Sequence, residues 1–124
     1  MEDWGSYMST EAKSFYRAFK NYLKREFPEA ELVGFKPNHY DFSGFVVQDG
    51  KCIFISHNLY RTPNGTAMAD FDDSSFMNGV LYRTALNTKD FSGKGGHNQF
   101  TSIFALADRL RNTFDNFDRY LIAA

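Results

Sequence analysis

The chain has 124 residues, 43% of them hydrophobic, and this combination suits one folded domain spanning residues 1–124. Its formal net charge of −1 argues against binding nucleic acid through overall charge, although one basic face could still do so. Cys52 is the only cysteine, which excludes an internal disulfide and a paired-cysteine metal site and fits a reducing compartment. We therefore expect a cytoplasmic protein, and the lack of a long apolar run or a signal-peptide pattern predicts no membrane association.

Apolar side chains recur at three- and four-residue steps near the start of the chain. They are Ala12, Phe15, Tyr16, Phe19, Tyr22, Leu23 and Phe27. This spacing predicts a helix over about residues 10–27 with one face toward the core. Ser9 or Thr10 can cap the first turn, and Pro28 marks the end because the residue before a proline disfavours helical geometry.

The opposite side of this predicted helix carries a basic stripe. A solvent-exposed charged face is the simpler interpretation. Contact with phosphates or with an acidic partner is the alternative. The stripe consists of Lys13, Arg17, Lys20 and Lys24.

The pattern between residues 31 and 86 changes to short strand-like runs separated by turn residues. The clearest unit is a hairpin at Asp49-Gly50, because this dipeptide favours the positive φ angles of a tight turn. We expect a meander of three or four antiparallel strands. The runs that supply it are 31–36, 45–47, 52–55, 58–62 and 80–86.

Three carboxylates, Asp70, Asp72 and Asp73, lie close together in the sequence. Calcium loops need a wider, regular ligand spacing with a glycine and a final glutamate, which are absent here. We therefore interpret the three residues as caps of a short turn or as an acidic surface patch, and we predict no metal and no cofactor.

A second helical pattern closes the chain, with apolar residues at three- and four-residue spacing from Phe100 to Leu121 and Thr101 as a plausible cap. Its outer face mixes charges of both signs, which is typical of a scaffold helix. The order helix, antiparallel strands, helix predicts an α+β fold with both helices packed on one face of the sheet.

A glycine-rich loop, SGKGG at residues 92–96, joins the last predicted strand to this helix. Its backbone N–H groups could bind an anion, with Arg83, Lys94 and His97 supplying charge. The loop lacks the spacing of a nucleotide-binding P-loop, however. The alternative is a tight connection in which Asp90 and Asn98 accept hydrogen bonds from nearby backbone amides.

Catalytic patterns are weak. Cys52 and His57 could form a nucleophile pair, yet a cysteine inside a strand is more often a buried, inert thiol. The three histidines and Cys52 lack the short paired spacing of zinc ligands. We therefore predict that the protein is not an enzyme.

The hairpin GFVVQDGKCIFIS, followed by LYRTALNTKDFSGKGGHNQF and a closing helix, resembles small domains of the large polyvalent protein associated type. The resemblance covers about residues 43–110 and depends on Arg83-Thr84-Ala85, residues 89–93, Asn98 and Phe100. Lys94 between glycines and His97 before the asparagine depart from that pattern. The resemblance implies an origin in phages or conjugative elements, whose small proteins often block host defence complexes, and it supplies no catalytic residue.

Two functions from different classes remain. The first is a non-enzymatic, anti-defence (anti-CRISPR-like) inhibitor that contacts a host protein complex through exposed aromatics, the Asp70–Asp73 patch or the basic stripe. The second is binding of a nucleotide, cyclic oligonucleotide or nucleic-acid phosphate by the glycine-rich loop and the basic stripe, which predicts strong salt dependence.

Overall fold

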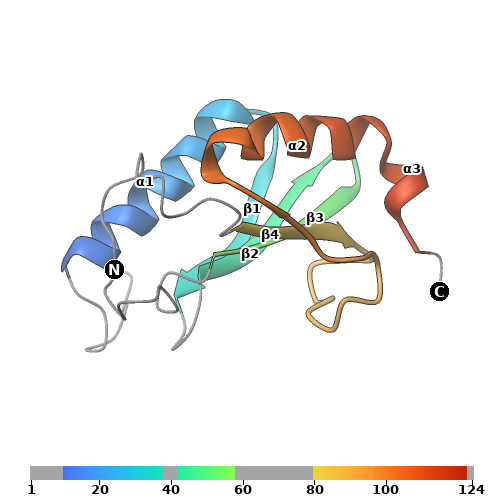
Figure 1. Ribbon diagram of the computed structural model, residues 1–124, viewed down its shortest axis with the longest axis horizontal. Coiled ribbons are helices and arrows are strands. Elements are labelled where there is room, and N and C mark those ends of the chain that lie inside the picture. Colours follow the sequence, from blue (N-terminus) through green and yellow to red (C-terminus); the bar gives the residue numbers. More distant parts are fainter. Residues whose placement is uncertain (1–9, 38–41, 58–79, 123–124) are drawn as a thin grey trace.

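The computed structural model describes residues 10–37, 42–57 and 80–122, and it shows an α+β fold (Figure 1). Helix α1 (Thr10–Glu26) precedes a five-stranded antiparallel sheet, and helices α2 (Ile103–Asp115) and α3 (Phe117–Tyr120) follow it. The strands are β1 (Glu31–Pro37), β2 (Phe42–Gln48), β3 (Lys51–His57), β4 (Val80–Ala85) and β5 (Gln99–Thr101), and they lie side by side in chain order. None of the helices described is long and apolar enough to cross a membrane.

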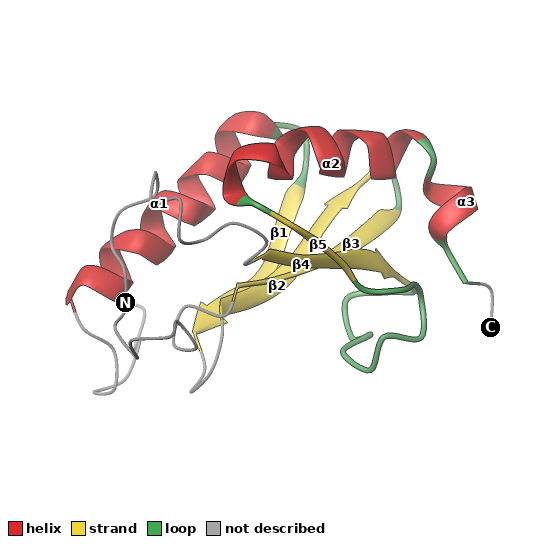
Figure 2. Ribbon diagram, viewed as in Figure 1, coloured by secondary structure: helices red, strands yellow, loops and turns green. Residues whose placement is uncertain are grey.

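The main core lies between the sheet and the two long helices, which cover the same face (Figure 2). Phe19 and Leu23 of α1 and Leu106 and Leu110 of α2 are fully buried there. Alternate residues of each strand point to one side of a sheet, so the central strands contribute every second side chain to this core. The sheet residues of the cluster include Val46, Ile53, Ile55, Val80 and Tyr82.

The second face of the sheet carries a smaller cluster formed by Phe45, Cys52 and Ala85. Phe54 packs against it, and the ring of Phe91, which directly precedes the glycine-rich loop, meets the Phe54 ring edge-on at 6.0 Å between centroids. Phe91 nevertheless stays 64% exposed. Phe91 therefore contributes packing to the face that α1 and α2 leave uncovered.

The structure confirms the predicted first helix and the hairpin. The helix runs over Thr10–Glu26 and ends before Pro28. At the turn, Asp49 has φ 53° and Gly50 has φ 75°, the two positive angles that the Asp-Gly signal predicts. The predicted run 58–62 lies outside the described residues.

The C-terminal part differs from the prediction in three ways. A fifth strand, β5, pairs with β4, so the sheet is larger than the three or four strands expected. The side chain of Ser102, not that of Thr101, caps α2 by accepting a hydrogen bond from the Ala105 N–H at 3.2 Å. The expected single helix stops at Asn116, where φ is −119°, and a separate short turn, α3, follows.

Candidate functional site

The glycine-rich loop is organised around the buried carboxylate of Asp90. This carboxylate accepts hydrogen bonds from the backbone N–H groups of Leu86 at 3.0 Å, Lys94 at 3.1 Å and Gly95 at 2.8 Å. Consecutive N–H groups that converge on one point form an anion-binding concavity. Here the bound anion is the protein's own side chain, so the N–H groups of Lys94 and Gly95 are not open to a phosphate.

Arg83 completes this arrangement beneath the loop. Its guanidinium donates to the Asp90 backbone carbonyl at 2.5 Å, lies 3.5 Å from the Asp90 carboxylate and stacks over the Phe54 ring at 4.4 Å. Burial alone would raise the pKa of Asp90, but the three N–H donors and Arg83 outweigh it and lower that pKa. Burial lowers the pKa of Arg83, and Asp90 opposes that effect. Both side chains are therefore paired structural groups.

The glycines of the loop allow it to lie directly against β4. A Cβ on Gly95 would come within 2.5 Å of the Leu86 nitrogen and 2.7 Å of the Ala85 backbone. The Gly95 carbonyl accepts hydrogen bonds from the Thr84 hydroxyl at 2.7 Å and from the Ile122 N–H at 2.9 Å. The loop thus joins the last long strand to the C-terminal segment, as expected for a tight connection.

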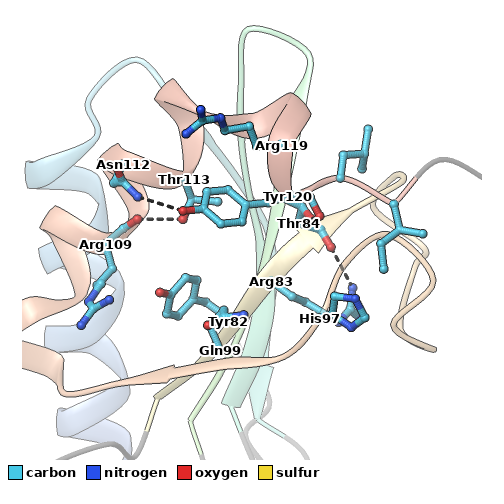
Figure 3. A pocket seen from close by; sticks show the side chains of 12 residues that line it. Tyr82, Arg83, Thr84, His97, Gln99, Arg109, Asn112, Thr113, Arg119 and Tyr120 are labelled. Atoms are coloured by element: carbon cyan, nitrogen blue, oxygen red, sulfur yellow. Dashed lines mark hydrogen bonds between the residues drawn. The ribbon is translucent and has the colours of Figure 1, made fainter.

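A pocket of about 250 Å³ lies beside this junction, where β4 and β5 meet α2, α3 and the C-terminal segment (Figure 3). Twelve residues line it, all in the described part of the chain. They are Tyr82, Arg83, Thr84, His97, Gln99, Arg109, Asn112, Thr113, Arg119, Tyr120, Leu121 and Ile122.

The pocket lining is basic and rich in hydrogen-bond donors. It includes the exposed side chains of Arg109 and Arg119 and contains no carboxylate among its twelve residues. Within the described residues, neither arginine forms an ion pair, whereas Arg83 pairs with Asp90 and Arg111 pairs with Glu26. Guanidinium groups present planar sets of N–H donors that match phosphate and carboxylate oxygens. The pocket is therefore suited to an anion.

One wall of the pocket depends on the chain after the break at Asn116. The Thr84 hydroxyl lies 3.0 Å from the carbonyl oxygen of Tyr120, which fixes α3 against β4. The Tyr120 ring extends into the centre of the pocket in Figure 3, and its hydroxyl accepts a hydrogen bond from the Asn112 side-chain amide at 3.3 Å. This hydrogen bond holds the Tyr120 ring against α2.

The structure separates the residues that the sequence suggested as one site. Among residues 86–98, only His97 lines the pocket, and its side chain has no hydrogen bond within the described residues. Lys94 and Asn98 are exposed outside the pocket. Arg17, Lys20 and Lys24 lie on α1, whose residues do not line this pocket, and Lys13 belongs to the same helix. Asp70, Asp72 and Asp73 lie outside the described residues.

The groups considered for catalysis are buried in separate places. Cys52 belongs to the small cluster on the second face, where burial raises the pKa of its thiol. His57 is 1% exposed and its ring meets that of Phe19 edge-on at 5.8 Å. Burial lowers the pKa of His57 from 6.5 to about 4. Over the described residues, no group of three or more potential ligands is placed to hold a metal ion.

The sequence interpretation missed Arg109 and Arg119 because it assigned both to the outer face of a scaffold helix. A signal was present, since Arg109, Asn112 and Thr113 follow the three- and four-residue spacing of one helix side. Arg119 and Tyr120 could not be placed without the break at Asn116. That break carries α3 out of line with α2 (Figure 1).

Comparisons of the chain with protein-family models, curated proteins and solved structures found no match. The resemblance to large polyvalent protein associated domains therefore stays a prediction.

Proposed function

We propose that the protein binds a small anionic ligand in the pocket between β4, β5, α2 and α3, and that it does so without catalysing a reaction. The observation that carries this proposal is the pairing pattern of the arginines. Arg83 and Arg111 are matched by carboxylates, whereas Arg109 and Arg119 line a concave site that contains none. Ligand sites are typically concave and are lined by a few polar groups.

The positive charge of the lining supports the same proposal. Two guanidinium groups on the lining of a partly enclosed site make its potential positive, which favours an anion there. Because Arg109 and Arg119 are exposed, they are hydrated without a ligand, and binding only replaces water by ligand oxygens. The volume of about 250 Å³ lies just below the range of roughly 300–1,000 Å³ usual for drug-sized ligands. The ligand is therefore small.

Isothermal titration of the full chain with inorganic pyrophosphate tests the proposal. We expect saturable binding that weakens as salt increases and is lost in an R109Q/R119Q variant. The matched control is K24Q/K89Q, which removes the same charge from exposed lysines that do not line the pocket. Equal binding by wild type and R109Q/R119Q, or no binding at low salt, would contradict the proposal.

A different observation favours a second function, inhibition of a host protein complex by direct contact. The loop over residues 86–98 presents Phe91 at 64% exposure and Leu86 at 38%, flanked by exposed Lys89 and Lys94. Its single acidic residue, Asp90, is buried. An exposed aromatic side chain with a basic rim suits an apolar protein surface bordered by carboxylates. The mobile-element origin implied by the resemblance makes a defence complex of the host cell the expected partner.

This second function is tested by capture of purified candidate defence complexes. We expect a complex to bind the wild-type protein and to lose at least tenfold in affinity for the F91S/K94E variant. The K24E variant changes a charge on α1 instead and should bind as wild type does. A captured complex that binds F91S/K94E equally well would show that this loop is not the contact surface.

A further inference from the structure

The shape and lining of the pocket narrow the class of ligand beyond an anion. A cavity of about 250 Å³ is several times larger than the roughly 30 Å³ that one water molecule occupies in the liquid. A lone inorganic phosphate would leave most of that space to water. The ligand therefore has a body in addition to its charged group.

The rings that line the pocket indicate a flat body. Tyr120, which is 42% exposed, extends its ring across the cavity, while Tyr82 and His97 border it from the sheet and the loop (Figure 3). Aromatic side chains at such a site stack on nucleobases of any type, because every base has a π-face. Leu121 and Ile122 add apolar surface at the same wall.

The charges match one phosphate monoester. Such a group carries about −1.5 to −2 charges at pH 7, and Arg109 and Arg119, which form no ion pair within the described residues, supply two positive charges. Arginine can also hold phosphate oxygens through two parallel N–H donors.

Gln99 supplies a group that can read the edge of a base. It is the register partner of Tyr82, so its side chain projects from the same face of the sheet, and it is exposed at the pocket. No hydrogen bond fixes its amide within the described residues. An amide that offers one acceptor and two donors is the usual partner for adenine and a good partner for other base edges.

From this lining we infer that the pocket binds a nucleoside monophosphate, with the phosphate at Arg109, the base against the Tyr120 ring and the base edge at Gln99 (Figure 3). The inference rests on the proposed anion-binding function and adds the identity of the ligand body. It assigns a recognition role to Tyr120 and Gln99, which carry no charge, and both roles can be tested separately from the arginines.

The test compares whole ligands with their parts by isothermal titration. The four ribonucleoside 5′-monophosphates are titrated alongside ribose 5-phosphate and the four nucleosides. We expect at least one monophosphate to bind tenfold or more tightly than ribose 5-phosphate, since stacking on one aromatic ring contributes about that factor. The corresponding nucleoside should also bind more weakly than its monophosphate, because it lacks the phosphate.

Three variants show which side chains bind the base. Y120L should reduce the affinity for the monophosphate on the order of tenfold and leave ribose 5-phosphate unaffected. Y120F keeps the ring and loses only the hydrogen bond from Asn112, so it should bind within about threefold of wild type. Q99A should weaken binding of the monophosphate on the order of tenfold and leave ribose 5-phosphate unaffected.

The outcomes separate this inference from the proposed function. If ribose 5-phosphate binds as tightly as every monophosphate, or if pyrophosphate binds and no monophosphate does, the inference is overturned while anion binding stands. If Y120L binds the preferred monophosphate as wild type does, the stacking role is overturned. If neither pyrophosphate nor any monophosphate binds, both proposals fail.

Discussion

The glycine-rich loop and the pocket beside it both present groups that bind anions, but only one of them already contains an anion. In the loop, Asp90 occupies the N–H groups of Lys94 and Gly95 and pairs with Arg83. In the pocket, Arg109 and Arg119 face a lining without a carboxylate. A cation or a cluster of amides therefore indicates a binding site only when the protein does not supply the counterion itself.

The largest effect is expected from removing the internal anion of the loop. D90A leaves the Arg83 guanidinium buried without a charge partner and frees three backbone donors. Breaking a buried pair in this way costs about 3–5 kcal/mol of unfolding free energy. Urea denaturation measures it, with D108N as a control because the Asp108 side chain is 88% exposed. A loss below about 1 kcal/mol for D90A would show that the loop is not built around this carboxylate.

The next largest effect is a pH dependence of the unfolding free energy, and it is caused by His57. This residue lies in the core and in neither anion-binding region. Its pKa is about 4 in the folded protein and 6.5 ordinarily, so between these values the unfolded chain takes up a proton that the folded chain does not. Stability therefore falls as pH decreases from about 6.5 toward 4, by at most about 3 kcal/mol. The loss from Asp90 comes only below its ordinary pKa of 3.8, because its folded pKa is lowered.

Urea denaturation at pH 7 and pH 4.5 measures this dependence. The H57L variant should show a smaller decrease than wild type, since it has no group to protonate at that position. An identical decrease in both proteins would mean that other groups cause it.

A smaller effect is expected where the loop touches β4. G95A places a methyl group against the Ala85 and Leu86 backbone, which cannot rotate away, so we expect a loss of about 1–3 kcal/mol. Gly50 has a positive φ but open space around it, and G50A should cost about 1 kcal/mol from backbone strain alone. Thermal denaturation compares the two. A G95A protein as stable as wild type would indicate that the loop can lift from the strand.

The smallest effect on stability is expected in the pocket. R109Q/R119Q removes two exposed charges that have no ion-pair partner in the described residues, so the unfolding free energy should change by less than about 0.5 kcal/mol. Chemical denaturation at low salt measures the change. A large loss would mean that the arginines stabilise the fold, as Arg83 does, and would remove the contrast between the two regions.

Local sequence signals were enough for the helix Thr10–Glu26 and the Asp49-Gly50 hairpin, since both follow from spacing and turn chemistry. The strand Gln99–Thr101 was not foreseeable, because three residues have no period and this strand exists only through pairing with β4. Asp90 was correctly considered as an acceptor for loop amides. The pocket was missed because it depends on long-range contacts, above all the Thr84 hydroxyl against the Tyr120 carbonyl 36 residues away.

The most direct test of the central claim is a map of backbone amide shifts in an NMR titration of the wild-type protein with pyrophosphate. We expect the largest saturable shifts at residues 109–122 and 97–99, which surround the pocket. The amides of Lys94 and Gly95 should shift little, because Asp90 already accepts their hydrogen bonds. If the largest shifts fall on Lys94 and Gly95 and the residues around Arg109 and Arg119 do not shift, anion binding in the pocket is contradicted.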